Sequence, residues 1–522
     1  MSESGSTNLF RSAAGLCVGA LFSAQARLTP DRIALQAGNR RWTFAELDSR
    51  TNRLARVLAA LGVARGDRVA MLSENTPEYV ELKLAAAKLG AIVGCLNWRQ
   101  ADPELVYCIG LIAPKVLIAS QRFRAVTERI DHGVGIRRVL GDAFESALQA
   151  ESDHALPDVA QAEDGLLVLY TSGTTGHPKG AVISHRAMVA RSWVNAIDRT
   201  TDDADAFVAW TPLFHMGASD HVLSTLLRGG KAIVVDGFDA AVLARVMATE
   251  RLGWLHVMPG TAERLIEELR ISRVQPKGLR YIGLMADLMP RAAIARLTRL
   301  LNAPYVNTFG STEAGGVASG GVIGIGVTPL TLSKRQSSLC RVRLVDEEGR
   351  DVPDGAPGEM WVRSPALFSG YWGAPELNAE VFAGGWFHTG DVFVRNADAS
   401  LDFVDRRKYL IKSGGENIYP AEIERLLLAS PRIAEAAVVR RPDAQWGEVP
   451  VAFVVASDPT LLAHDVIELC REQLAKYKLP REVRFVQASA LPRSASGKII
   501  RHELEKQLST QPPTDGAAHT PD

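Results

Sequence analysis

The stretch that decides the fold is RVAMLSENTPEYVELKLAAAKLGAIVGCL, residues 68–96. Its first five residues, Arg68–Leu72, form a short apolar run that is typical of a buried strand. Residues 79–89 place apolar side chains at helical spacing, and residues 91–96 are a second strand-like run. A strand, a helix and a strand in this order predict parallel strands covered by helices, because a parallel pair needs a crossover connection.

The same alternation extends outward from this unit. Residues 44–61 have a helical pattern, and helical and strand-like segments alternate from Leu21 to about Asp402, which predicts an α/β domain. Between Val352 and Asp405 short strands are separated by Gly, Pro, Asn and Asp, and this spacing predicts an antiparallel β portion.

A smaller unit follows this β portion. Pro420 stands where the first turn of a helix tolerates proline, and Ile423, Leu426 and Leu427 share one helical face. Strand-like runs at 436–439 and 449–455 and a helix near 462–477 complete an α+β unit of about one hundred residues, an ordinary domain size. The chain ends in a segment rich in Pro, Thr and Gly, which predicts disorder.

The composition excludes several classes of protein. The chain has 522 residues, of which 47% are hydrophobic and 23% charged, so neither a disordered nor a fibrous protein is expected. Lys and Arg together number 59, as do Asp and Glu, and the chain therefore lacks the basic excess that binds nucleic acid. No nucleic-acid partner is expected.

The five cysteines are far apart and form no CxxC pair, which argues against a zinc site and a disulfide framework. The apolar stretch 13–20 follows a start with Arg11 as its only basic residue, which is a poor match to a signal peptide. No apolar run approaches the ~18 residues that an integral membrane segment needs. We therefore expect a cytoplasmic protein.

The strongest chemical signal is YTSGTTGHPKG, residues 170–180. A glycine-rich turn at the end of a strand can direct several backbone N–H groups at a phosphate, while hydroxyl side chains add donors and Lys179 adds charge. The spacing differs from that of a Walker A loop, so a P-loop NTPase is not expected.

This segment resembles the phosphate-loop signature of the adenylate-forming (AMP-binding) superfamily, which includes acyl-CoA synthetases, firefly luciferase and peptide-synthetase adenylation domains. Further stretches resemble the family's motifs in the family's order, and the match extends from Leu21 to about Gln507. They are FGSTE (309–313), GYW (370–372), GWFHTGD (385–391), DRRK and KSGGEN (405–408 and 412–417) and LPRSASGK (491–498).

The resemblance implies a domain organisation. A large N-terminal α/β domain would occupy residues 1–404, and residues 405–411, with Lys408, would form a hinge. Residues 412–507 would form a small mobile α+β C-terminal domain, followed by a disordered tail at 508–522.

The resemblance also implies site residues. A carboxylate is a poor electrophile, so the acid is first joined to AMP, which requires the charge on the α-phosphate to be neutralised. Glu313 would hold Mg²⁺, the implied cofactor. The implied catalytic residues are Lys498, Thr312, Glu313 and His215. The implied ATP/AMP-binding residues are Thr171, Ser172, Gly173, Thr174, Thr175, Gly176, Lys179, Asn307, Thr312, Asp391 and Arg406, and the implied coenzyme A loop is Ser413, Gly414 and Gly415.

The segment PLFHMG, residues 212–217, resembles the acid-side motif of acyl- and aryl-CoA ligases. Amino-acid-activating relatives place an Asp where this chain has His215, so a fatty or aromatic acid is expected instead. One departure concerns LMADLMP, residues 284–290, where relatives carry a small Gly-Ala-rich stretch. Because of the bulky Met285 and the charged Asp287, the shape of the pocket does not follow from the resemblance.

The sequence therefore predicts an ATP-dependent acid–CoA ligase whose partners are a small carboxylic acid, ATP and coenzyme A, and which can form a homodimer. Two alternatives stay open. One is an adenylation enzyme that loads the thiol of a carrier protein, and the other is a nucleotide-binding regulator without activity.

Overall fold

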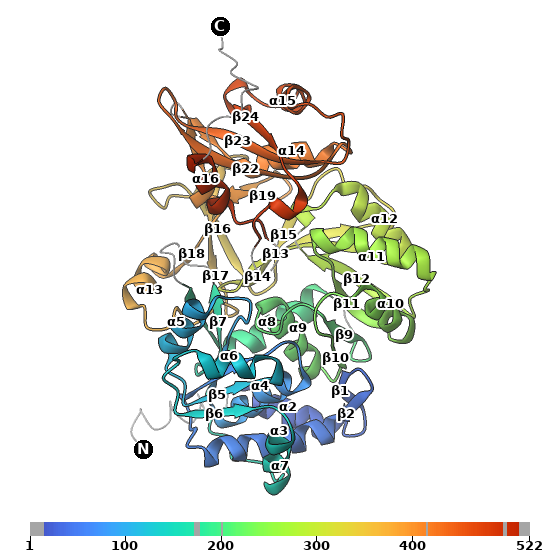
Figure 1. Ribbon diagram of the computed structural model, residues 1–522, viewed down its shortest axis with the longest axis vertical. Helices are drawn as coiled ribbons and strands as arrows, with labels where there is room; N and C mark the ends of the chain where they lie inside the picture. Colours follow the sequence, from blue (N-terminus) through green and yellow to red (C-terminus); the bar gives the residue numbers. More distant parts are fainter. Residues whose placement is uncertain are drawn as a thin grey trace.

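The computed structural model describes residues 15–171, 178–199, 202–284, 286–413, 416–493 and 498–510. The strands form three sheets, of thirteen, six and five strands. The two larger sheets belong to the first part of the chain. Figure 1 shows the five-stranded C-terminal part, in orange and red, at the top of the molecule above the remainder.

The six-stranded sheet contains the strands that residues 68–96 predict. Its order is β6-β5-β3-β4-β7-β8, and its pairs are parallel except for the last, β7–β8, which is antiparallel. The expected parallel arrangement is confirmed. The strands are β3 (Arg68–Leu72), β4 (Ile92–Cys95), β5 (Val116–Ala119), β6 (Ile136–Val139), β7 (Gly165–Thr171) and β8 (Lys179–Ser184).

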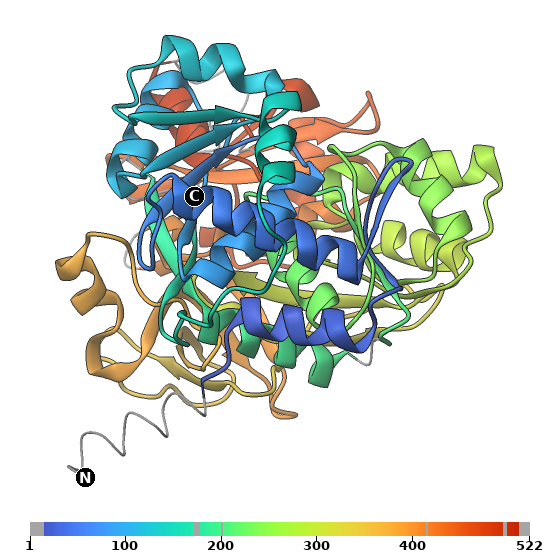
Figure 2. The same cartoon turned by 90° about the horizontal axis from the view of Figure 1, so that it is seen from below.

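Helix α4 (Pro77–Leu89) is buried along its whole length. It packs against β4 and β7 of the six-stranded sheet, β1 of the largest sheet, and helices α2 and α3. Figure 2 shows these two N-terminal helices, in dark blue, across the lower face of the molecule. The neighbouring helices are α2 (Val18–Leu28), α3 (Phe44–Ala60), α5 (Asp102–Ile112), α6 (Arg124–Arg129) and α7 (Asp142–Ala150).

The thirteen-stranded sheet has a parallel run in its middle and antiparallel pairs at both ends, one of which is the pair β1–β2. Its order is β16-β17-β18-β19-β15-β14-β13-β12-β11-β9-β10-β1-β2. The run from β13 to β1 is parallel, and the run from β16 to β14 is antiparallel, as predicted for residues 352–405. The strands are β1 (Ile33–Ala37), β2 (Arg40–Thr43), β9 (Ala206–Ala209), β10 (Ala232–Val234), β11 (Leu252–His256), β12 (Leu279–Leu284), β13 (Tyr305–Ser311), β14 (Gly315–Ile323), β15 (Lys334–Gln336), β16 (Arg341–Val345), β17 (Pro357–Arg363), β18 (Phe387–Arg395) and β19 (Leu401–Arg406).

Two groups of helices pack near this sheet. Helices α8 and α9 lie against each other in the centre of the molecule, where α8 reaches β8 and β14 and α9 reaches β9. Helices α10, α11 and α12 lie together on the right-hand side in Figure 1. Their bounds are α8 (His185–Asp198), α9 (Met216–Leu227), α10 (Ala240–Thr249), α11 (Pro259–Ser272), α12 (Arg291–Leu301) and, at the left edge, α13 (Pro375–Val381).

The C-terminal unit has its own core, formed by α14, α15 and the strands beneath them. The helix predicted at Pro420 is present as α14 (Pro420–Ala429), but α15 (Ala463–Arg471) ends well before the predicted residue 477. Its last buried residue is Cys470, and Pro480 disfavours helix in the residue before it. The strands are β20 (Ile411–Ser413), β21 (Glu416–Ile418), β22 (Ile433–Asp443), β23 (Gly447–Ala456) and β24 (Glu482–Phe485).

The predicted disorder of residues 508–522 is wrong at its start. Helix α16 (Arg501–Thr510) continues three residues into that segment, because Leu504 and Leu508 are buried against the strands of the C-terminal unit. Residues 511–522 lie outside the described part of the chain.

Candidate active site

A buried carboxylate with open hydrogen-bonding capacity marks the first part of the site. Asp391 in β18 is 1% exposed and faces Arg406 across the β18–β19 pair, with 3.0 Å between Oδ1 and the Arg406 Nε. The angle of this ion pair is unfavourable for a hydrogen bond, and both carboxylate oxygens lack a hydrogen-bond donor. Burial raises the pKa of Asp391, while the charges of Arg406 and Lys498 oppose the rise. This carboxylate can accept hydrogen bonds from two hydroxyl groups.

The glycine-rich segment connects two paired strands. Thr171 ends β7, Lys179 begins β8, and these two residues are partners in the β7–β8 ladder. The predicted phosphate loop is therefore the connection of a hairpin, and Thr171 and Lys179 mark its two ends. The remaining predicted members, Ser172, Gly173, Thr174, Thr175 and Gly176, lie outside the described residues.

The GYW segment brings Glu313 to this hairpin. Residues 369–372 run beside β8, and Trp372 N–H donates to the Gly180 carbonyl at 2.8 Å. The Tyr371 hydroxyl donates to Glu313 Oε1 at 3.0 Å, and Lys179 Nζ lies 5.2 Å from the centre of the Tyr371 ring. Burial and the Glu313 charge raise the pKa of Tyr371, so its hydroxyl stays protonated and orients the carboxylate. The Lys179 ammonium group thus lies near the Tyr371 ring, and the Glu313 carboxylate contacts the Tyr371 hydroxyl.

Arg191 of α8 connects the FGSTE motif to α9, the helix that follows the acid-side motif. Its guanidinium donates to the Thr312 carbonyl at 2.9 Å, and the same group forms an ion pair with Asp220 of α9 at 3.2 Å. Because Arg191 and Asp220 are buried, this pair fixes the Thr312–Glu313 backbone relative to the helix that follows the acid-side motif. The sequence reasoning missed Arg191, since an arginine within a helix gives no signal of a buried role.

Lys498 belongs to the C-terminal unit, yet its charge acts on the site of the large domain. Its pKa is lowered, chiefly by burial and then by Arg406, while Asp391 and Glu313 oppose the shift. The residue as a whole is nevertheless exposed to solvent. The same charge also lowers the pKa of His215, so Lys498 lies close to both the nucleotide-side and the acid-side residues.

His215 stands at the N-terminus of α9. Its Nε2 is buried without a hydrogen-bond partner, and burial together with Arg99 and Lys498 lowers the pKa of His215 to about 4. The imidazole is therefore neutral at physiological pH and has one ring nitrogen available to a ligand.

Two buried polar residues hold the loop before His215. Lys83 of α4 donates from Nζ to the Leu213 carbonyl at 2.7 Å and to Ser219 Oγ at 2.5 Å. Asn75 accepts from Leu213 N–H at 2.7 Å and donates to carbonyls of residues 209, 211 and 235. Neither role was predictable, because both contacts join segments more than one hundred residues apart.

The departure at residues 284–290 has a structural explanation. Asp287 is buried and paired with Lys334, whose Nζ lies 2.8 Å from Oδ1, so a neighbouring cation offsets its charge. Asn307 accepts from Ala286 N–H and donates to the Leu332 carbonyl, each at 2.7 Å. This amide therefore supports the turn η2 (Ala286–Leu288), and its role toward a nucleotide stays a prediction. Met285 lies outside the described residues.

Lys408 lies in the turn η4 (Arg407–Tyr409), between the last strand of the large sheet and the first of the small one. Tyr409, which replaces an acidic residue, lies between two cations: Lys408 Nζ is 4.9 Å and Arg501 Cζ is 4.6 Å from its ring centre. Ser413 ends β20 and is buried, whereas Gly414 and Gly415 lie outside the described residues. The roles of Lys408 and of this loop stay predictions.

Neither a metal cluster nor a membrane span is present among the described residues. No three His, Cys, Asp or Glu side chains there come together as a metal cluster. In the same part of the chain, every helix is too short or too polar to cross a membrane.

Comparison with known proteins agrees with this geometry. The model of the AMP-binding enzyme family matches residues 22–372, and that of the AMP-binding enzyme C-terminal domain matches residues 422–498. The indoleacetate–CoA ligase of Aromatoleum aromaticum is 37% identical over 93% of this chain and 96% of its own length. The feruloyl-CoA synthase of an Amycolatopsis species is 36% identical over 93% and 97%. ATP-bound MatB from Rhodopseudomonas palustris superposes with a TM-score of 0.83 at 28% identity and covers 94% of this chain and 99% of its own.

The chain therefore belongs to the AMP-binding enzyme family, the adenylate-forming superfamily. Within it, the curated relatives place the chain among the acid–CoA ligases, which are AMP-forming enzymes. The fold and the activity predicted from the sequence are confirmed, and the two alternative functions are not favoured.

Proposed function

We propose that this acid–CoA ligase activates a fatty or aromatic carboxylic acid in two steps at the site formed by Asp391, Glu313, His215 and Lys498. In the first step a carboxylate oxygen attacks the α-phosphorus of ATP, and pyrophosphate leaves to give the acyl-adenylate. In the second step the coenzyme A thiol attacks the acyl carbon, the acyl–oxygen bond breaks, and AMP and a proton are released.

The observation that supports this proposal most strongly is the state of Asp391. A buried carboxylate with neither oxygen hydrogen-bonded is costly, and in a native structure it indicates an absent donor. The two adjacent hydroxyls of a ribose supply two donors at one carboxylate. The neighbouring Arg406 and Lys498 can offset the negative charge of a phosphate attached to that ribose.

The residues present fit a magnesium ion that arrives with the nucleotide. Mg²⁺ is usually held by one or two carboxylates together with substrate phosphates, and Glu313 offers one carboxylate oriented by Tyr371. When bound, the ion would offset charge on the phosphates as pyrophosphate leaves. The protein itself orients Glu313, places Lys179 at the end of the hairpin and brings Lys498 to the α-phosphate.

On the acid side, neutral His215 is the group available to the carboxylate. A neutral imidazole can donate one hydrogen bond to the acid without forming an ion pair that would weaken the nucleophile. No acidic residue stands at this position to pair with an α-ammonium group. Since the reaction consumes ATP and free coenzyme A, we further propose that the enzyme acts in the cytoplasm.

The proposal is tested with a panel of fatty, aromatic and amino acids, assayed for AMP and pyrophosphate release with and without coenzyme A. Fatty or aromatic acids should release AMP and consume coenzyme A, while amino acids should be activated poorly because their ammonium group would be desolvated without a partner. Pyrophosphate exchange that is faster with a free amino acid would contradict the acid class. AMP release that depends on a carrier protein and leaves coenzyme A untouched would support the carrier-loading alternative.

A second prediction concerns the metal. Glu313→Gln keeps the shape of the side chain and its contact with Tyr371 but removes the anionic oxygen that a hard cation prefers. We expect turnover to fall steeply and the Mg²⁺ concentration for half-maximal rate to rise. Glu348→Gln is a matched control, because Glu348 pairs with Arg350 on the surface of the same domain. A Glu313→Gln enzyme with a wild-type Mg²⁺ titration would place the ligand elsewhere.

A further inference from the structure

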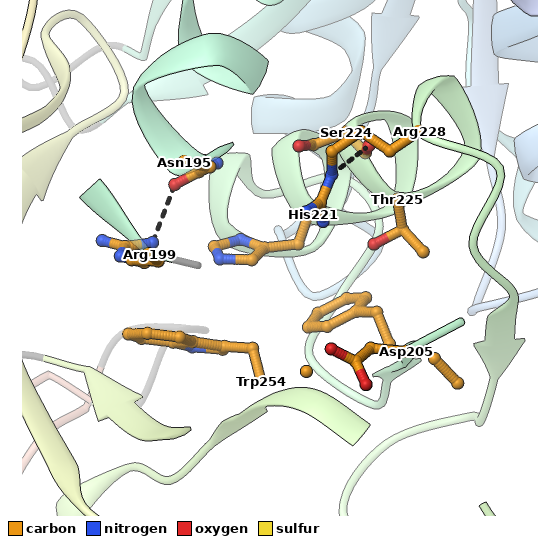
Figure 3. Close-up of a pocket in the computed structure, with 11 residues that line it drawn as sticks. Asn195, Arg199, Asp205, His221, Ser224, Thr225, Arg228 and Trp254 are labelled. Carbon is orange, nitrogen blue, oxygen red and sulfur yellow. Dashed lines mark hydrogen bonds between the residues drawn. The ribbon is translucent and has the colours of Figure 1, made fainter. Parts of the chain in front are cut away.

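The cavity beside α9 is too small to bind a substrate. Figure 3 shows it between the side chains of Arg199, His221 and Trp254. Its volume of about 20 Å³ has room for about one water molecule. The residues that line it all belong to the large domain, whereas Lys498 belongs to the C-terminal unit. Contacts between the two units bear more directly on the position of Lys498.

Arg501 connects the C-terminal unit to the large domain. It is the first residue of α16, and its guanidinium donates to Glu424 Oε2 at 2.6 Å and forms an ion pair with Asp405 Oδ1 at 3.4 Å. Glu424 belongs to α14, and Asp405 to β19 of the thirteen-stranded sheet. The same guanidinium lies over the Tyr409 ring, with Cζ 4.6 Å from the ring centre. Arg501 is therefore held from both sides of Lys408.

The Asp405 carboxylate binds two elements of the C-terminal unit at once. Asp405 is 1% exposed, and its Oδ2 accepts from the Ala421 N–H at 2.7 Å. Ala421 lies in the first turn of α14, where the backbone N–H groups have no partner within the helix. Oδ1 accepts from the Arg406 N–H at 2.7 Å and pairs with Arg501. One carboxylate of the large domain thus fixes the start of α14 and the start of α16.

Two buried carboxylates share the charge of Arg501. Glu424 is 2% exposed, and its Oε1 accepts from the Val438 N–H at 2.7 Å. Burial raises the pKa of Glu424, the charge of Arg501 opposes the rise, and the charge of Asp405 adds to it. A guanidinium displaced from this position would leave both carboxylates without their cation, which is costly in a buried site. The start of α16 is therefore held firmly relative to β19.

Lys498 lies three residues before Arg501 in the chain. Between them, the Ile500 N–H donates to the Pro492 carbonyl at 2.8 Å, so the chain before α16 is held as well. Three residues span at most about 10 Å, and the position of Arg501 therefore limits where the Lys498 backbone can lie. A shift of α16 would move Lys498 with it.

We propose that Asp405 and Glu424 are positioning residues for the adenylation step. By holding Arg501, they place Lys498 at the α-phosphate of ATP. This inference rests on the proposed function, in which Lys498 acts in the first step. Because a misplacement of about 1 Å can cost on the order of 10²-fold in rate, a charge contact of this kind depends on such support.

The test uses the full-length enzyme, the acid of the panel that the wild type activates fastest, and the synthetic acyl-adenylate of that acid. Asp405→Asn keeps the shape of the side chain but turns an NH₂ group toward one of two donors, the Ala421 N–H or Arg501. We expect pyrophosphate release in a single turnover to slow by about tenfold or more, while the affinity for ATP changes far less. Thioester formation from the added acyl-adenylate should stay near the wild-type rate, because that step does not use Lys498.

A double variant separates positioning from a merely structural role. Asp405→Asn combined with Lys498→Ala should be no slower in adenylation than Lys498→Ala alone, because a residue that acts only through Lys498 then has nothing to position. Asp458→Asn is the matched control. Asp458 pairs with Arg432 at 2.8 Å within the C-terminal unit, and its replacement should leave both half-reactions unchanged.

If Asp405→Asn does not fold, Arg501→Lys decides the matter by the same measurements, because lysine keeps the charge but lacks the planar fork that reaches two carboxylates. Wild-type pyrophosphate release, equal slowing of both half-reactions, or additive effects in the double variant overturns the inference and leaves the proposed function standing. Absence of pyrophosphate release by the wild type with every acid of the panel overturns both.

Discussion

Lys498→Ala should slow acyl-adenylate formation by on the order of 10²-fold or more, as expected when a charge contact to the transition state is lost. Lys498 comes from the C-terminal unit, and its charge acts on Asp391, Glu313 and His215 of the large domain. No other described side chain of the C-terminal unit is shown to act on all three. The variant should therefore lose rate while its affinity for ATP changes far less.

The measurement is pyrophosphate release in a single turnover, together with ATP binding at equilibrium. Lys506→Ala serves as a control, because Lys506 lies in α16 of the same unit and is paired with Glu503 on the surface. A wild-type rate of pyrophosphate release in Lys498→Ala would remove this lysine from the mechanism.

The pH dependence follows from the same environment. Burial and Arg406 lower the pKa of Lys498, so the amine loses its proton at a lower pH than an ordinary lysine. The protonated form is the one that stabilises the phosphate, so the adenylation rate should fall as the pH rises through this lowered pKa. In Lys498→Arg the residual rate should lose that alkaline decline, since arginine stays charged.

Lys408→Pro should leave adenylation largely intact and abolish thioester formation. The two steps need different groups at one acyl carbon, and Lys498 and the predicted coenzyme A loop at Ser413 lie on the same small unit. One orientation of the small unit does not readily bring both Lys498 and the coenzyme A loop to the acyl carbon. Enzymes are known to complete an active site by moving a domain. In the structure, Leu410 N–H donates to the Arg407 carbonyl, and position 408 of this turn favours proline. Proline would therefore fix the pose in which Lys498 reaches the site.

Single-turnover assays of each half-reaction make the comparison, with Lys408→Ala as the control that removes the side chain but keeps the backbone free. Lys408→Ala should carry out both half-reactions. If Lys408→Pro forms thioester at the wild-type rate, the C-terminal unit does not rotate about this residue.

The fold was predictable where the local pattern and the tertiary environment agree. Strand β3 has the predicted bounds, and α4 and β4 lie within one or two residues of them, because buried strands and helices retain their apolar periodicity. The early end of α15 was missed, since residues 472–477 are mostly polar and exposed, and among them only Leu474 packs against the core. The last three residues of α16 were missed because Leu508 packs on strands that are distant in sequence.

The site was predictable only for the residues carried by motifs. Asp391, Glu313 and Lys498 were indicated by their resemblance to family motifs, and the structure brings them together. Arg191, Lys83 and Asn75 hold these motifs in place from helices and loops whose sequences show ordinary periodicity. The pairing of Asp287 could not be predicted, because its partner Lys334 is 47 residues away and a sequence without its contacts does not show that a charge is neutralised.

Transfer of oxygen from the acid to AMP tests whether an acyl-adenylate precedes the thioester. An acid labelled with ¹⁸O in its activated carboxylate is converted to the thioester in ordinary water, and the products are analysed by mass spectrometry. Attack of the carboxylate on the α-phosphorus leaves one labelled oxygen in AMP after the thiol displaces it. We therefore expect one ¹⁸O atom in each AMP and none in pyrophosphate. Unlabelled AMP, or label in inorganic phosphate, would contradict it.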